Sequence, residues 1–395
     1  MVYCSIGKKS LFFFVLFFIF INNSLQEFKT IAIPYLGKFE FIVRLKSKVL
    51  NKDVQFQIAI NSDFTWSHSD QADNKDDFHY NILKKISGRN YTSASVNDSF
   101  SFNNDEINCP IQQYLVNSNL RYNFGIIGLS YKILNKDSSL LHQLVHNHYI
   151  NELTFSISPN PSPNSGGMIY FGSLPSIIQK GKNIAKCNVI QAFSQWSCNM
   201  KKVYIGDYVY DKQSVVKFST TTQDMIVPKK FFLLLKEFVL NIDNNIYCKL
   251  ILNGIQFLCT LDYLNLLEQS LSFVIDEYKY TFLLKDLFYC SENECKSYII
   301  ASDSQGEQWE FGNKFLTSYN TTFDMESDAI YFYSYAPFEK ASDGLNTLFG
   351  QNEEISMTRY SLIFILIGLL IIIILVAIYL QFNKLRKRYS YFEEL

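Results

Sequence analysis

Three histidines, His142, His146 and His148, form the cluster of this sequence that most suggests metal chemistry. The first two are four residues apart, so a helix would place both imidazoles on one face, where they could bind zinc. A zinc hydrolase also needs a glutamate base and a third ligand, and neither stands nearby at the required spacing. We therefore interpret the cluster as part of a surface helix and expect no metal. No glycine-rich phosphate loop follows an apolar run, so we expect no nucleotide cofactor either.

Two aspartates, Asp63 and Asp224, each follow an apolar run that leads into a polar turn, within Gln57–Ser67 (QIAINSDFTWS) and Val215–Pro228 (VVKFSTTTQDMIVP). Paired carboxylates that share one proton can activate a water molecule. Neither aspartate is followed by the Thr-Gly or Ser-Gly that makes a tight turn and orients a carboxylate. We interpret both as turn or surface residues. Ser219 is not expected to be a nucleophile, because it lacks a neighbouring base and a G-x-S-x-G elbow.

The same two segments resemble the active-site segments of pepsin-like aspartic proteases (peptidase A1). In that family, hydrophobic residues precede Asp-Thr-Gly-Ser or Asp-Thr-Gly-Thr, and a tryptophan closes the first run. When the first segment is aligned on Ser62 and Trp66, the aspartate position holds Ala59. In the second segment it holds Ser219. The resemblance implies that the cleft turns contain Asn61, Ser62, Trp66, Thr220, Thr221 and Thr222.

Further segments fall in the order that the family shows. FGIIGLSY (Phe124–Tyr131) resembles the segment that completes the first active-site loop, and SGGMIYFGSL (Ser165–Leu174) resembles a Gly-Gly hairpin. WEFGNKF (Trp309–Phe315) resembles the Ile-Leu-Gly-Asp-x-Phe ending, from which Glu310 and Asn313 depart. The resemblance covers about residues 30 to 335. It implies an all-β, bilobal, double-barrel fold with an N-terminal lobe over 27–185 and a C-terminal lobe over 186–336.

Composition agrees with a β-rich globular protein. The chain has 395 residues, 48% of them hydrophobic, and an aromatic content of 16% that favours strands. Polar and apolar residues alternate in IAIPYLGKFEFIVRL and DVQFQIAI, which predicts a hairpin, and Lys229–Leu240 predicts an amphipathic helix. The net charge of -1 gives no electrostatic reason to expect a nucleic acid partner.

Both ends of the chain carry membrane signals. The short apolar run Leu11–Ile21 predicts a signal peptide over residues 1–26. After a stalk at 337–360, an uncharged apolar segment predicts a transmembrane helix over 361–382. The tail, 383–395, begins with basic residues and should be cytoplasmic. We expect a single-pass type I membrane protein of the secretory pathway, with a lumenal or extracellular ectodomain.

The chain contains eight cysteines, and Cys4 falls within the signal peptide, so an odd number remains. The resemblance implies a disulfide of the C-terminal lobe between Cys259 and either Cys290 or Cys295. Cys187 and Cys198 could join a hairpin. No partner is assigned to the remaining cysteines, Cys109 and Cys248.

Three N-glycosylation sequons stand at Asn90, Asn97 and Asn320. The first two fall in a polar, irregular stretch, and we expect them on exposed loops. The family would carry its flap hairpin here, but no flap-type Tyr-Gly segment follows Phe100–Phe102, so a shortened flap is expected.

Replacement of both aspartates removes the carboxylates that would share a proton. We therefore interpret the protein as a non-catalytic homologue that binds a peptide or protein in the cleft. An active aspartic endopeptidase is the alternative, and it requires that the alignment of both turns be wrong. A third interpretation is a structural surface protein with no ligand in the cleft.

Overall fold

The computed structural model describes the chain between residues 30 and 341, which falls within the first of two compact units, Met1–Ala341. Within that range, the residues outside the description are 38–40, 49–50, 64, 69–80, 87–88, 103–106, 118–124, 134–135, 161–165, 174, 241–246 and 303–306. For residues 81–86, 89–97 and 107–117 only the backbone is described. The second unit, Ser342–Leu395, and the expected signal peptide and transmembrane segment lie outside the described residues.

None of the helices in the described part of the chain combines the length and apolar character that a membrane span requires.

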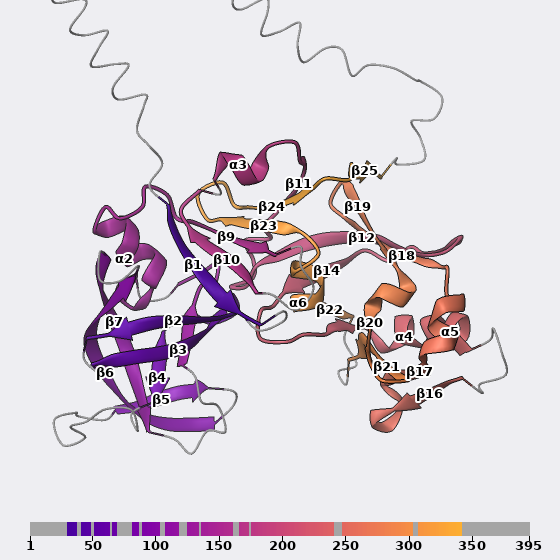
Figure 1. Ribbon diagram of the computed structural model, residues 1–395, viewed down its shortest axis with the longest axis horizontal. Helices are drawn as coiled ribbons and strands as arrows, with labels where there is room; N and C mark the ends of the chain where they lie inside the picture. Colours follow the sequence, from indigo (N-terminus) through magenta and orange to yellow (C-terminus); the bar gives the residue numbers. More distant parts are fainter. Residues whose placement is uncertain are drawn as a thin grey trace, which may run out of the picture. The chain divides into compact units, whose positions relative to one another are not determined.

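Among the described residues, the first sheet has 13 strands and mixes parallel with antiparallel pairs (Figure 1). In spatial order they are β11 (Asn183–Asn188), β24 (Ala329–Ser334), β23 (Asn320–Asp324), β9 (Thr154–Pro159), β10 (Gly167–Phe171), β1 (Ile31–Leu36), β2 (Ile42–Ser47), β3 (Lys52–Ala59), β8 (Gly125–Gly128), β4 (Trp66–His68), β7 (Ile107–Asn117), β6 (Arg89–Phe102) and β5 (Asn81–Ile86). Because β2 also pairs with β6, the strands between them form a closed ring.

The second sheet has 12 strands among the described residues. They are β16 (Cys248–Ile251), β17 (Gln256–Thr260), β21 (Glu294–Ala301), β15 (Met225–Val227), β22 (Gln308–Phe311), β14 (Ser214–Phe218), β12 (Ser197–Ile205), β18 (Ser270–Ile275), β19 (Tyr278–Leu283) and β25 (Glu339–Lys340), with β13 (Tyr208–Tyr210) beside β12 and β20 (Phe288–Ser291) beside β21.

Short helices connect the strands, so the fold is mostly β rather than all-β. They are α2 (Leu140–His146), α3 (Ser176–Gln179), α4 (Lys229–Leu240), α5 (Leu261–Leu266) and α6 (Asn313–Leu316), with 3-10 turns η3 (Lys136–Ser138), η4 (Leu252–Gly254) and η5 (Leu284–Leu287). The predicted helix Lys229–Leu240 is confirmed as α4, which buries Phe231, Phe232, Leu235 and Val239 on one face.

The first sheet contains strands from both halves of the sequence. β23 and β24, drawn in orange in Figure 1, come late in the chain but pair with β9 and β11 of the first sheet. In the core, the ring of Phe155 stacks on Phe323 with centroids 4.7 Å apart, and Trp196 packs edge-on against Phe323 at 5.1 Å. These buried aromatic rings join β9 and β23 to the residue that precedes β12.

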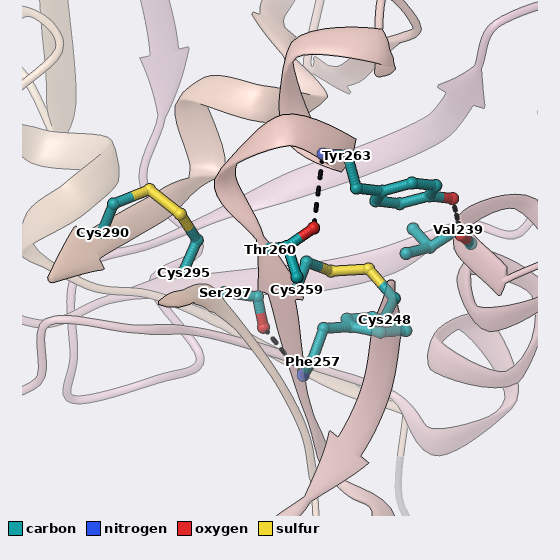
Figure 2. Close-up of a disulfide and its surroundings, with 9 residues drawn as sticks. All are labelled: Val239, Cys248, Phe257, Cys259, Thr260, Tyr263, Cys290, Cys295 and Ser297. Atoms are coloured by element: carbon teal, nitrogen blue, oxygen red, sulfur yellow. Dashed lines mark hydrogen bonds between the residues drawn. A yellow bond between two sulfur atoms is a disulfide. The ribbon is translucent and has the colours of Figure 1, made fainter. Parts of the chain in front are cut away.

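The disulfides correct one expectation and confirm another. Cys187 pairs with Cys198, as expected, but not within a hairpin, because this bond joins β11 of the first sheet to β12 of the second. The expected bond from Cys259 to Cys290 or Cys295 is wrong. Strand register places Cys248 directly opposite Cys259, and these two are bonded. Cys290 is bonded to Cys295, which lies opposite it across β20 and β21 (Figure 2).

The first two sequons do not lie on loops as expected. Asn90 and Asn97 both fall within β6, which pairs with β7 over eleven register positions, and Asn320 begins β23. The Asn320 side chain is half-buried, and its Oδ1 accepts a hydrogen bond from the Ser158 hydroxyl at 2.6 Å. Glycosylation of these residues stays a prediction. The turn between β6 and β7 lies outside the described residues, so the shortened flap also stays a prediction.

Candidate functional site

The first of the two turns follows β3, which ends at Ala59. Ile58, Ala59 and Ile60 are all buried, so apolar side chains anchor the start of the turn. The Ala59 carbonyl accepts hydrogen bonds from the N–H of Ser62 at 3.2 Å and from the N–H of Leu129 at 2.9 Å. Leu129 directly follows β8, which runs parallel to β3. The backbone of this turn is therefore held by the neighbouring strand.

The second turn follows β14 and is held in the same manner. The N–H of Ser219 donates to the Phe311 carbonyl at 3.0 Å, and the N–H of Gly312 donates to the Asp224 carbonyl at 3.0 Å. A Cβ atom on Gly312 would lie 2.4 Å from the Asp224 carbonyl oxygen and 2.5 Å from that of Thr222. Only glycine can occupy this position without displacing the turn.

Strand pairing shows that the two turns are structurally equivalent. Around the first turn, β3 is parallel to β8, β8 is antiparallel to β4, and β4 is parallel to β7. Around the second turn, β14 is parallel to β22, β22 is antiparallel to β15, and β15 is parallel to β21. The same four-strand arrangement thus occurs twice, and each copy presents its turn at the end of its first strand.

Thr220 connects the second turn to the backbone of the first. The Thr220 hydroxyl donates to the Ile58 carbonyl at 2.5 Å and accepts from the N–H of Ile60 at 3.1 Å. The Thr220 carbonyl in turn accepts from the Asn313 amide at 3.1 Å. Ile60 is the counterpart of Thr220 in the first turn and has no hydroxyl, so it makes no equivalent side-chain bond to the second turn. Thr220 was predicted as a residue of the cleft turn, but its bonds to the first turn were not predicted.

Beside this connection, Ala59 and Ser219 occupy the equivalent positions of the two turns. Ala59 is fully buried, and Ser219 is 1% exposed. The Ser219 hydroxyl lies 3.4 Å from the Asn61 amide nitrogen and 3.0 Å from the Thr221 hydroxyl. The Asn61 amide also donates to the Thr221 hydroxyl at 3.1 Å. The Ala59 methyl group, the hydroxyls and the amide do not ionise near neutral pH. The hydroxyls and the amide can therefore form hydrogen bonds, but none of these groups can serve as an acid or a base for proton transfer.

The remaining predicted turn residues support the strands and turns. Trp66 is buried in β4, opposite Ile126 of β8. The Ser62 carbonyl accepts from the N–H of Ser130 at 2.9 Å, and the Thr222 hydroxyl accepts from the N–H of Asp224 at 3.2 Å.

Asp224 is the ionisable group of the second turn. Its side chain is half-buried, and this burial raises the pKa of the carboxyl to about 6. The pKa of Tyr298 is raised mainly by burial and then by the nearby Tyr289. The Asp224 charge makes a further, smaller contribution to this rise. Among the described residues, Asp224 and Asp63 make no hydrogen bond with each other. The second turn therefore holds one perturbed carboxyl rather than a proton-sharing pair.

The three histidines lie on and just after the short helix α2. His142 and His146 lie on α2, and His148 follows it in a left-handed conformation with φ of 58°. The His142 Nδ1 atom lies 3.0 Å from the hydroxyl of Ser139, the residue that caps the helix. Burial, and then the charge of Lys136, lower the pKa of His142. No group of three potential metal-binding side chains occurs in the described ranges.

Comparisons with known proteins agree with this architecture. The family model described as eukaryotic aspartyl protease matches residues 65–334, a range that begins after the first turn and includes the second. The solved structure titled "Crystal structure of Basic 7S globulin from soybean" is similar with a TM-score of 0.61 and 12% identity, over 78% of this chain and 95% of that chain. At this identity the likeness concerns the fold. No curated protein matches the sequence.

Three disulfides in a pepsin-like domain indicate a secretory or extracellular protein. The extent of the family match is sufficient to assign the family. This chain belongs to the eukaryotic aspartyl protease family.

Proposed function

We propose that this protein is a non-catalytic member of the family, which binds a peptide or protein segment at its two turns. The observation that carries the proposal is the position of Ala59 and Ser219. The repeated strand arrangement places these two residues at equivalent points of the two turns, which supports their assignment, by family resemblance, to the aspartate positions of a pepsin-like enzyme.

Aspartic proteases need both carboxylates, because one acts as a base toward water while the other protonates the substrate carbonyl. Each assisted proton transfer contributes about 10²- to 10⁴-fold to the rate. Ala59 offers no proton acceptor, and the Ser219 hydroxyl stays neutral. The backbone contacts that hold the turns nevertheless persist, including the close approach at Gly312. The two carboxylates are absent from the proposed aspartate positions, while the hydrogen bonds that hold both turns are retained. This combination supports binding of a peptide without its hydrolysis.

Groups suited to a peptide backbone surround these positions. Thr221 is exposed, and Asn61, Ser62 and Thr222 are partly exposed. Their amide and hydroxyl groups can donate to carbonyls and accept from N–H groups of an extended chain, as in strand-like peptide recognition.

The test is capture of peptides by the immobilised full chain from a mixture of unstructured peptides. Bound peptides are released and sequenced by mass spectrometry. We expect intact peptides with a shared pattern, and expect the substitution Thr221→Trp to abolish their retention by covering the turns. The matched control is Ser291→Trp, at an exposed position of β20. Equal retention by both variants, or no retention by the natural chain, would contradict the proposal.

The alternative function is an active aspartic endopeptidase, and one observation favours it. The Asp224 carboxyl has a pKa of about 6, within the range useful for acid–base catalysis. If Asp224 served as the catalytic acid, cleavage of a peptide mixture would be measurable at acidic pH and would be lost in Asp224→Asn. Unchanged cleavage in that variant would exclude Asp224 as the acid.

We also propose that residues 361–382 anchor the domain in a membrane, with the glycan sites Asn90, Asn97 and Asn320 on the lumenal or extracellular side. The uncharged apolar segment and the basic residues after it support this topology. Glycosidase treatment of the chain from sealed microsomes should lower its apparent mass, and added protease should remove only the short tail. Loss of the whole domain to protease would contradict the topology.

A further inference from the structure

Four cysteines form a continuous row across four neighbouring strands of the second sheet (Figure 2). In strand register, Cys248 of β16 lies opposite Cys259 of β17, Cys259 lies opposite Cys295 of β21, and Cys295 lies opposite Cys290 of β20. Residues directly opposite each other point to the same face of a sheet. The two disulfides are therefore adjacent along one row, with Cys259 and Cys295 at its centre.

The spacing within the row permits a different central bond. The Cα atoms are 4.1 Å apart in Cys248–Cys259 and 4.0 Å apart in Cys290–Cys295, as in the close, non-hydrogen-bonded pairs of antiparallel strands. The N–H of Thr260, next to Cys259, donates to the carbonyl of Tyr247, the residue before β16, at 2.9 Å, so the backbone of Cys259 itself faces β21. Cys259 and Cys295 then form the hydrogen-bonded kind of pair, whose Cα atoms are about 5.5 Å apart. That spacing lies within the usual range for a disulfide.

Solvent reaches this row from one end. Cys290 is exposed, whereas Cys248, Cys259 and Cys295 are 4%, 2% and 0% exposed. A thiol from solution can therefore attack the sulfur of Cys290, and the thiolate that leaves is that of Cys295.

We propose that the row is a thiol–disulfide exchange site, which transfers an attack at Cys290 to the buried Cys248–Cys259 bond. An external thiolate first forms a mixed disulfide with Cys290 and releases the Cys295 thiolate. The Cys295 thiolate then attacks the Cys259 sulfur, which forms Cys259–Cys295 and releases the Cys248 thiolate, which takes up a proton from water. Each step forms one S–S bond and breaks one, so no further oxidant or reductant is required.

The consequence is a change in the edge of the sheet. β16 is the outermost strand on this side and pairs with β17 alone among the described strands. After exchange it is no longer linked covalently to β17 at Cys248, while β17 and β21 become linked. Attack of a thiol on the exposed Cys290 of β20 thus removes the covalent link between β16 and β17.

Two reciprocal substitutions test the exchange without an added thiol. In Cys290→Ser the unpaired thiol begins on Cys295, and exchange moves it to Cys248. In Cys248→Ser it begins on Cys259, and exchange moves it to Cys290. The folded full chains are alkylated and then mapped by non-reducing peptide analysis. We expect most label on Cys248 in Cys290→Ser and on Cys290 in Cys248→Ser. Both variants should contain a Cys259–Cys295 cross-link. Label that stays on Cys295 and Cys259 would overturn the proposal.

The natural chain provides a second readout that does not depend on the folding of variants. Treatment with reduced glutathione should place the adduct on Cys290 and expose Cys248 to alkylation. The matched control is Cys187–Cys198, in which both cysteines are fully buried, and this bond should remain intact. Glutathione on Cys290 with alkylation of Cys295 and an intact Cys248–Cys259 bond would overturn the proposal.

Discussion

The hydroxyl of Thr220 is bonded to the backbone on both sides of Ala59: it donates to the Ile58 carbonyl and accepts from the N–H of Ile60. All of these groups are buried. Together with the Asn61 amide, this side chain connects the two turns beside Ala59 and Ser219.

The first prediction concerns this connection. The substitution Thr220→Val keeps the volume but leaves a buried carbonyl and a buried N–H without their partner, so we expect the free energy of unfolding to fall by about 1–3 kcal/mol. Urea denaturation followed by tryptophan fluorescence measures the change. Thr221→Val is the control, because Thr221 is exposed and water can replace its hydrogen bonds. Equal losses in the two variants would argue against a special role for Thr220.

The second prediction concerns the glycine beneath the second turn. In Gly312→Ala, the added Cβ collides with two backbone carbonyls that cannot rotate away, so we expect a loss of about 3 kcal/mol in unfolding free energy. Gly181→Ala is the matched control. Gly181, by contrast, has open space around it, and its φ of 73° costs an alanine about 1–2 kcal/mol without any collision. A smaller loss at Gly312 than at Gly181 would show that the turn can move.

The third prediction concerns pH. Burial raises the Asp224 pKa from 3.8 to about 6, so the folded state favours the protonated carboxyl. The contribution of Asp224 to stability is greatest below about pH 4 and is lost as the pH rises through about 6. Asp224→Asn cannot ionise. We expect the melting temperature of this variant to exceed that of the natural chain at pH 7 and the difference to shrink toward pH 4. A difference that is constant with pH would contradict the burial of this carboxyl.

The fourth prediction concerns the bond between the two sheets. Removal of Cys187–Cys198 by a double substitution to alanine should lower the unfolding free energy by about 3 kcal/mol, because the bond closes a short loop and both residues are buried. Thermal unfolding under non-reducing conditions measures the loss. No change in stability would mean that packing alone, including the rings around Trp196, holds β11 and β12 together.

Much of the fold was predictable from local pattern. Alternating polar and apolar residues predicted the β2–β3 hairpin, and one apolar face predicted α4. Alignment of the first segment on Ser62 and Trp66 put Ala59 at the aspartate position, and the resemblance of the second segment put Ser219 there. The strands place these residues at equivalent points of two similar turns. Their assignment as aspartate positions stays a prediction.

Features that depend on long-range register were not predictable. The partner of Cys259 depends on which strand lies beside β17 and in which register. The family resemblance implied Cys290 or Cys295, whereas β16 places Cys248 opposite Cys259. Asn90 and Asn97 were predicted on loops because the surrounding sequence is polar and irregular, yet backbone pairing with β5 and β7 makes the segment a strand. The pairing of β23 with β9 likewise joins residues from distant parts of the chain.

The most direct test of a binding role without catalysis is an assay of proteolysis. The purified full chain would be incubated with an unstructured protein mixture from about pH 3 to about pH 7, the range in which a shared-proton aspartate pair is active. A second sample would carry Ala59→Asp and Ser219→Asp together. We predict no new cleavage products from the natural chain at any pH, and intact peptides retained by it. Cleavage by the natural chain that pepstatin inhibits would contradict the proposed function.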